Sequence, residues 1–321
     1  MTVTRTNIVE DPGARDRFIE GVLGLKREIV SAEQNISVYD AFVIWHHRTM
    51  YTFTPPGQTD RNAAHRGPVF LPWHRLMLIA LEQQIQRVLG DATFGLPYWA
   101  WNQDGDLPVG QQARASVWAD DCMGGSGNPG QGDRVETGPF AYREDDPASW
   151  RVRVLPTPSG RLGLVDAALR RSLARDVPDL PTTAQARAAI ELGTYDEADW
   201  ETVSADTFRN VCEGWTPEPP GLHNRVHVWV GGDMGPSTSP NDPVFFLNHA
   251  NVDRMWAAWQ RRHPGAGYLP GLDGAPDLQG HRLGDELISI YPGAAPTIEA
   301  MLDVSDVYEY DTIEDFVSVD V

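Results

Sequence analysis

The stretch that decides the fold is LHNRVHVWVGGDMGPSTSPNDPVFFLNHANVDRMWAAWQRRHP, residues 222–264. Its spacing predicts one helix over residues 223–230, which stops at Gly231-Gly232. A second helix is predicted to start after Asp242-Pro243 and to run to Arg262. The residues after Met234, between these two helices, are expected to form a loop.

Three histidines of this stretch form one candidate metal site. His223 and His227 are four residues apart, so both imidazoles project from one face of the first helix. His249 lies one turn into the second helix and can add a third nitrogen. An isolated HxxxH pair is usually incidental, so this pattern alone is weak evidence for a metal.

A second group of histidines lies nearer the N-terminus. His46 ends a helical run, His65 lies in a loop and His74 opens the next helix; His47 adjoins the first of them. Imidazole suits copper, zinc, iron or nickel. There is no HExxH motif and no cysteine beside these residues, which disfavours metalloprotease and sulfur-rich zinc sites. Six unliganded buried imidazoles would be costly, so the two groups together predict metal binding.

The remaining pattern predicts one mainly α domain over residues 1–321, with large loops and few short strands. Residues 102–165 lack periodicity and contain several glycines, so we expect a long loop there. Further helices are predicted after Asp11-Pro12, from Ser37 with Asp40 as capping partner, from near Pro72, and over about 183–193.

Composition excludes some partners. The chain has 45 acidic and 26 basic residues and a net charge of -19, which disfavours nucleic acid and anionic membranes. No apolar run is long enough to span a membrane, and no leader is visible. Cys122 and Cys212 are expected to be free thiols in a reducing compartment, which favours the cytoplasm.

Several motifs resemble those of bacterial tyrosinases, a family of type-3 dinuclear copper proteins that includes polyphenol oxidases. AHRGPVFLPWHRLMLIALEQ at residues 64–83 resembles the first copper motif, and residues 222–264 resemble the second. YDAFVIWHH at 39–47, LPYW at 96–99 and the Tyr308-Glu309-Tyr310 motif also fit. The resemblance covers about residues 36 to 310.

The resemblance implies a central four-helix bundle that holds two copper ions, with O2 as co-substrate, which agrees with the four helical segments that carry histidines. The first copper's ligands would lie within residues 39–83 and the second's within 213–264. The implied ligands are His46, His65 and His74 for one ion, and His223, His227 and His249 for the other. His47 is a rival for the first position, although the helical phase favours His46. His263 and His281 match no motif and are expected at the surface.

The implied activity is oxidation of o-diphenols to o-quinones, with hydroxylation of monophenols. The alternatives are an o-aminophenol oxidase of a secondary-metabolite pathway and a haemocyanin-like O2-binding protein. A mononuclear or zinc site formed by one trio remains a third possibility. Small phenols and O2 are the expected partners, and a copper-delivery partner is compatible with this type of site.

Two residues are candidates for proton transfer. Glu213 lies in FRNVCEGW, which matches the family's FRxxxEGW segment with two extra residues before the histidine, and Asn224 follows the first ligand of the second site. In the family such a pair orients a water that deprotonates the phenol, whose pKa is near 10. The plainer alternatives are a solvated loop carboxylate and a helix-surface amide.

Four positions depart from the family or bear on the pocket. Ser237, in the loop after Met234, suggests an open substrate pocket, and Asn248 replaces a common histidine and is expected to affect substrate choice. Ala100 interrupts the usual PYWDW, and Ala63 excludes the thioether of fungal relatives. The chain ends soon after the tyrosine motif, so we expect no covering C-terminal domain and a solvated acidic tail over 304–321.

Overall fold

The computed structural model describes residues 2–200, 202–215, 221–272, 276–290, 293 and 295–317. It is one mainly helical domain, as predicted, in which the strands are short and pair two by two. The helices are α1 Pro12–Arg27, α2 Val38–Met50, α3 Phe70–Leu89, α4 Trp101–Gly105, α5 Val109–Gln112, α6 Thr183–Ile190, α7 Phe208–Glu213, α8 Leu222–Val230 and α9 Val244–Arg262. The strands are β1 Val3–Arg5, β2 Ile29–Ser31, β3 Ile36–Ser37, β4 Val152–Pro156, β5 Leu162–Ala167 and β6 Tyr308–Tyr310.

The helix ends follow from local chemistry. Asp11 caps α1 by accepting from the Ala14 N–H, and Ser37 forms the predicted capping box with Asp40 at α2. Helix α3 starts at Phe70, two residues before the predicted start, since a proline is tolerated in a first turn. It ends at Gly90, whose φ of 65° is the left-handed conformation that glycine adopts readily.

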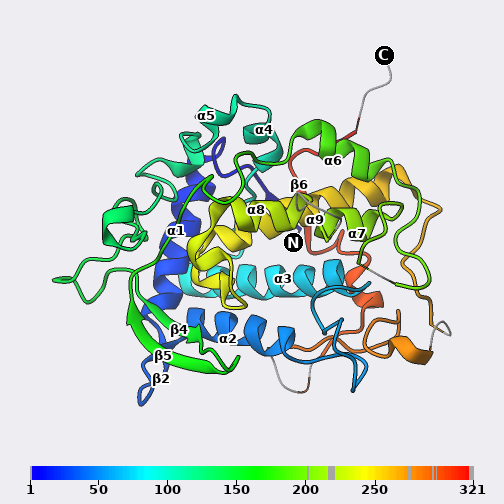
Figure 1. The fold of residues 1–321 in the computed structure, drawn as a ribbon, viewed down its shortest axis with the longest axis horizontal. Helices are drawn as coiled ribbons and strands as arrows, with labels where there is room; N and C mark the ends of the chain where they lie inside the picture. Colours follow the sequence, from blue (N-terminus) through cyan, green and yellow to red (C-terminus); the bar gives the residue numbers. More distant parts are fainter. Residues whose placement is uncertain are drawn as a thin grey trace.

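Figure 1 shows how the histidine-bearing helices are arranged. Helices α2 and α3 run side by side, and α8 and α9 lie on the other side of α3. Helices α3 and α9 are in contact, as are α8 and α9, while α1 packs along the outer side of α3. The two helix pairs therefore face each other across the centre of the molecule.

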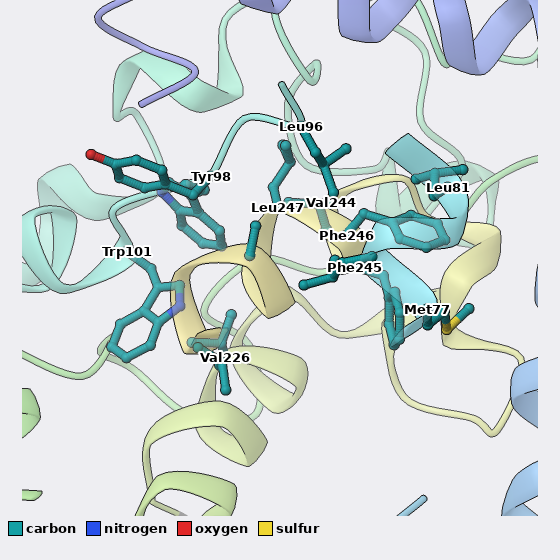
Figure 2. Packing of buried hydrophobic residues seen from close by; sticks show 14 of the residues in the cluster. Met77, Leu81, Leu96, Tyr98, Trp101, Val226, Val244, Phe245, Phe246 and Leu247 are labelled. Atoms are coloured by element: carbon teal, nitrogen blue, oxygen red, sulfur yellow. The ribbon is translucent and has the colours of Figure 1, made fainter. Parts of the chain in front are cut away.

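An apolar core fixes the distance between the two pairs. Figure 2 shows Met77 and Leu81 of α3 beside Phe245 and Phe246 of α9. These four side chains are at most 1% exposed. Each contributes about 1.5–3 kcal/mol through burial. The backbone N–H of Trp99 also donates to the carbonyl of Leu247 (3.1 Å) and attaches the segment after α3 to α9.

The long loop prediction for residues 102–165 was only partly right. Most of this stretch is irregular, but it also contains α4, α5, two 3-10 turns and the β4–β5 hairpin. The hairpin's antiparallel register pairs Val154 with Leu164 and Pro156 with Leu162.

The solvated acidic tail was predicted to begin at residue 304, but the chain still packs on the domain beyond that point. Strand β6 pairs in parallel with β1, and Asp315 accepts two hydrogen bonds (2.8 Å each) from the buried guanidinium of Arg254. Phe316 is 1% exposed. The chain therefore packs on the domain through residue 317, and residues 318–321 lie outside the described part.

Both cysteines are free, as expected, and the structure shows that both are buried. Burial raises the pKa of Cys122 to about 12, so its thiol stays protonated at neutral pH. In the described part of the chain no helix has the length and hydropathy needed to cross a bilayer.

Candidate metal centre

Three histidines from the first half of the chain converge. His46 comes from the end of α2, His65 from the loop before α3, and His74 from the first turns of α3. A ligand nitrogen of each lies within 4.8 Å of the others, and all three rings are buried. This spacing suits a single metal ion bound by three nitrogens.

His223, His227 and His249 form a second trio of the same kind. The first two project from one face of α8, as their spacing predicts, and the third projects from α9. The Nε2 atoms of His223 and His249 are 3.1 Å apart.

The two trios adjoin one another. The rings of His74 and His249 stack with centroids 4.1 Å apart and an interplanar angle of 7°. His65 and His223 lie 6.3 Å apart across the same gap, and Phe70 packs between the trios, 4.9 Å from His223. The six imidazoles therefore belong to one centre with room for two neighbouring ions.

Backbone carbonyls fix the orientation of four rings. The Nδ1 contacts are His46 to Ser237 O (2.7 Å), His74 to Phe70 O (2.8 Å), His227 to Met234 O (2.7 Å) and His223 to Glu213 O (3.1 Å). A carbonyl only accepts, so each of these Nδ1 atoms carries the proton and Nε2 keeps its lone pair. The Nε2 atoms of His46, His74 and His227 are buried and have no partner in the described residues. This donor set fits copper, and metals fill such unsatisfied positions.

All six imidazoles are held in the neutral, ligating form. Burial lowers the pKa of His46 to about 3 and that of His227 to about 4. Burial, reinforced by neighbouring rings, also places the pKa of the other four well below the usual value. The site is therefore ready for a cation at neutral pH without losing protons first.

A cavity of about 340 Å³ opens onto this centre. It is lined by His46, Met50, His65, Gly214, Trp215, His223, Asn224, His227, Val228, Gly235, Pro236 and Ser239. Among these described residues none has a formally charged side chain, and most of the wall is apolar. Sequence analysis anticipated Asn224 here but missed Trp215, although it lies in the same EGW motif as Glu213.

Glu213 is fully buried at the end of α7 and does not line the cavity. Its Oε1 accepts from the Arg66 backbone N–H (2.7 Å) and the Trp215 indole (2.7 Å), and its Oε2 accepts from Arg209 (3.2 Å). Burial raises its pKa, although Arg209 and the donors to the carboxylate oppose that shift. The plainer alternative, a solvated loop carboxylate, is wrong.

The two expected pocket residues, Ser237 and Asn248, do not line the cavity. Ser237 is in the loop between α8 and α9, but its hydroxyl contacts His47 Nδ1 (2.7 Å) and its carbonyl holds His46. Asn248 is 0% exposed on α9, and neither end of its amide has a partner among the described residues. The structure therefore does not bring either side chain to the cavity surface.

The other three histidines, His47, His263 and His281, do not belong to either trio. His47 lies outside both trios, so the helical phase that favoured His46 agrees with the geometry. The expectation that His281 lies at the surface is wrong: it is 0% exposed, and its Nε2 contacts the Thr54 hydroxyl (2.9 Å). His263 is partly exposed, and its Nε2 contacts Ile190 O (2.8 Å).

With this geometry in place, known families can be compared. The family model described as "Common central domain of tyrosinase" matches residues 36–262. The chain belongs to the tyrosinase family. It is 44% identical to a tyrosinase of Streptomyces glaucescens over 278 residues, 87% of this chain and 89% of the relative. It is 40% identical to the tyrosinase of Streptomyces antibioticus, over 97% of this chain and all of the relative. As a member of the tyrosinase family, the chain is a copper-dependent phenol oxidase.

Other relatives bear on the alternatives. Grixazone synthase of Streptomyces griseus is 36% identical over 96% of this chain and 99% of its own length. A polyphenol oxidase structure from Thermothelomyces thermophila matches with a TM-score of 0.65 and 21% identity, covering 96% of this chain and 88% of that one. An octopus hemocyanin unit matches with a TM-score of 0.55 and 17% identity, covering 97% and 68%. These two structures establish a fold shared by tyrosinases and hemocyanins.

Proposed function

We propose that the chain uses O2 to oxidise o-diphenols to o-quinones, and more slowly hydroxylates monophenols, at a pair of copper ions. His46, His65 and His74 would hold one ion, and His223, His227 and His249 the other. The observation that carries this proposal is the convergence of six neutral imidazoles at the inner end of a cavity. In each turnover of a diphenol the substrate gives up two electrons and two protons, and half an O2 becomes water.

Bound copper supplies O2 activation and takes up the electrons, and the protein supplies substrate position and proton transfer. The cavity volume of about 340 Å³ is at the lower end of small-molecule sites and suits a single aromatic ring. Trp215 provides an aromatic wall, and the Arg66 guanidinium lies 4.1 Å from its ring centroid. Apolar walls exclude water and favour a neutral phenol ring over a charged ligand.

The test of this proposal is metal reconstitution followed by an assay with catechol. We expect two copper ions per chain by metal analysis, and formation of quinone followed by its absorbance. Removal of copper with a chelator should abolish the activity, and added copper should restore it. One ion per chain would contradict the dinuclear site, and reversible oxygenation without quinone would indicate an O2 carrier of the hemocyanin type.

Glu213 is proposed to accept the phenol proton, and Asn224 to hold the water through which the proton passes. Both lone pairs of Glu213 Oε1 are engaged by Arg66 and Trp215, whereas Oε2 has one donor among the described residues and can accept another hydrogen bond. Because Glu213 does not line the cavity, the proton would pass from the phenol to Oε2 through a water held by the Asn224 amide. The raised pKa of the buried carboxyl makes it a better base than an exposed glutamate.

We expect Glu213→Gln to lower monophenol hydroxylation by at least about 10-fold and to leave o-diphenol oxidation within about 3-fold. An o-diphenol ionises more easily and needs the base less. The measurement is kcat on 4-methylphenol and 4-methylcatechol for variants with equal copper content. Glu309→Gln, at an exposed position of β6, is the matched control. Equal losses on both substrates would remove the assigned role.

An o-aminophenol oxidase is the second candidate, because grixazone synthase is similar to this chain over nearly its whole length. Comparing kcat/KM for an o-aminophenol and the matching catechol would decide between them. Loading the purified protein with free copper would also test whether a copper-delivery partner is needed. Retention in the cytoplasm remains a prediction from the free thiols.

A further inference from the structure

One residue contacts two consecutive histidines on α2. The Ser237 carbonyl accepts from His46 Nδ1 (2.7 Å), and the Ser237 hydroxyl contacts His47 Nδ1 (2.7 Å). His46 belongs to the first metal trio, and His47 does not. His47 is nevertheless 5% exposed, so its ring is held in place and not free in solvent.

The bond between Ser237 and His47 can form in either tautomer of the ring. A neutral imidazole has one donor and one acceptor nitrogen, and a hydroxyl can donate or accept, so His47 Nδ1 pairs with the Ser237 O–H in both cases. Burial lowers the pKa of His47, which favours the neutral ring.

Gly160 lies at the tip of the β4–β5 hairpin, which packs tightly against this end of α2. A side-chain carbon at Gly160 would lie 2.8 Å from Cε1 of Tyr51, and the φ of 76° also favours glycine. The Tyr51 ring in turn packs on His47, with centroids 4.6 Å apart. Met50, the residue before Tyr51, lines the cavity, so the hairpin tip lies beside the wall that holds the substrate.

Ser237 connects the His47 ring to the metal centre through two hydrogen bonds. Its hydroxyl contacts His47 Nδ1, and its carbonyl accepts from His46 Nδ1. The His46 Nε2 is buried and has no partner in the described residues. A change in the position of Ser237 would therefore be transmitted directly to the direction of the His46 lone pair.

We propose that His47 and Ser237 are positioning residues that hold His46 in its metal-binding orientation. This proposal rests on the proposed function, in which His46 holds the first copper. The hydroxyl bond to His47 attaches the loop between α8 and α9 to α2 at Ser237, and the Tyr39 hydroxyl attaches it again at the Pro240 carbonyl (2.7 Å). The His47 ring thus acts from outside the centre, without binding copper itself.

The test is the rate at which each copper-loaded variant loses metal to a chelator, together with the copper content after loading. We expect His47→Ala and Ser237→Ala each to speed loss of the first copper by about 10-fold, a size usual for residues that orient a metal ligand. The double variant should lose copper no more than about 2-fold faster than either single variant, because both substitutions break the same hydrogen bond between His47 and Ser237. The wild type should bind two copper ions.

Two conservative variants separate positioning from simple packing. The Oδ1 of asparagine can occupy the place of Nδ1 and accept from Ser237, so His47→Asn should retain copper within about 2-fold of the wild type. Glutamine places its amide nearer to Gly160 and loses the Ser237 contact, so His47→Gln should resemble His47→Ala. His263→Ala is the control, since His263 lies outside both trios.

The outcomes are distinct. A wild type that binds no copper contradicts the proposed function itself. A wild type with two coppers, and wild-type copper loss in Ser237→Ala, overturns the positioning role and leaves the function intact. Multiplying effects in the double variant would show that the two residues act separately, which also overturns it. If His47→Ala fails to fold, the Ser237→Ala and His47→Asn pair still decides the question.

Discussion

Replacing His249 with alanine should leave a folded chain that retains one copper ion and oxidises catechol at least about 10³-fold more slowly. His249 lies where the two trios meet. Its Nε2 is 3.1 Å from that of His223, and its ring stacks on His74 with centroids 4.1 Å apart. Without it the second trio has two nitrogens on one helix, which is too few to complete a three-nitrogen site.

Metal analysis and initial rates of quinone formation measure this effect, and far-UV circular dichroism checks the fold. His263→Ala is the matched control, because His263 follows the same helix and lies outside both trios. We expect the control to keep two copper ions and activity within about 2-fold, as for most substitutions away from a site. Full copper content in His249→Ala would show that the residue is not a ligand.

Much of the fold could be predicted because its signals are local. The cap of α2 is read from Ser37 and Asp40, three residues apart, and the structure contains that capping box. The i, i+4 spacing of His223 and His227 places both on one face of α8 wherever the helix packs. Helix boundaries followed from glycine and proline in the same way, with an error of two residues at α3.

The partners that orient the metal ligands could not be predicted. Most are backbone carbonyls, such as Ser237 O for His46 and Met234 O for His227, and every residue type has a carbonyl. Sequence analysis therefore assigned Ser237 by its small side chain and the loop that it occupies. The structure instead shows that its carbonyl and hydroxyl both point at histidines of α2.

Long-range ion pairs were missed for a related reason. Asp315 and Arg254 are 61 residues apart, and nothing beside either residue indicates the other. An acidic stretch without lysine or arginine looks like a solvated tail when its partners lie elsewhere in the chain. His281 was similarly placed at the surface, because its hydrogen bond to Thr54 spans 227 residues.

Asp253 on α9 is the residue whose loss should destabilise the fold most. Its Oδ1 accepts from Arg75 (2.6 Å), and its Oδ2 accepts from Arg5 (3.5 Å) and from the Tyr310 hydroxyl (2.6 Å). Asp253→Ala leaves the guanidinium of Arg75 buried without its carboxylate. We expect the free energy of unfolding to fall by about 3–5 kcal/mol at pH 7, measured by urea denaturation.

The same carboxylate predicts a pH dependence. Burial alone would raise the pKa of Asp253, but Arg75 and Arg5, with hydrogen bonds from the Tyr308 and Tyr310 hydroxyls, hold it below its usual value. The unfolded chain then binds the proton more readily than the folded one, so protonation favours unfolding. The stabilisation is present above the unfolded pKa of about 3.9 and is lost as the pH falls through the lower folded value.

The difference between wild type and Asp253→Ala should therefore stay constant between about pH 5 and 8 and shrink only below about pH 4. Asp306→Ala, an exposed position in the segment before β6, should change stability by less than about 0.5 kcal/mol. A loss under about 1 kcal/mol for Asp253→Ala would mean that the two arginines find other acceptors. Arg5 has one already in Glu82 (2.9 Å), whereas the other acceptors within reach of Arg75 are the backbone carbonyls of Met301 and Leu302 and the Gln260 amide. These are neutral and cannot replace a carboxylate, so the larger loss is expected.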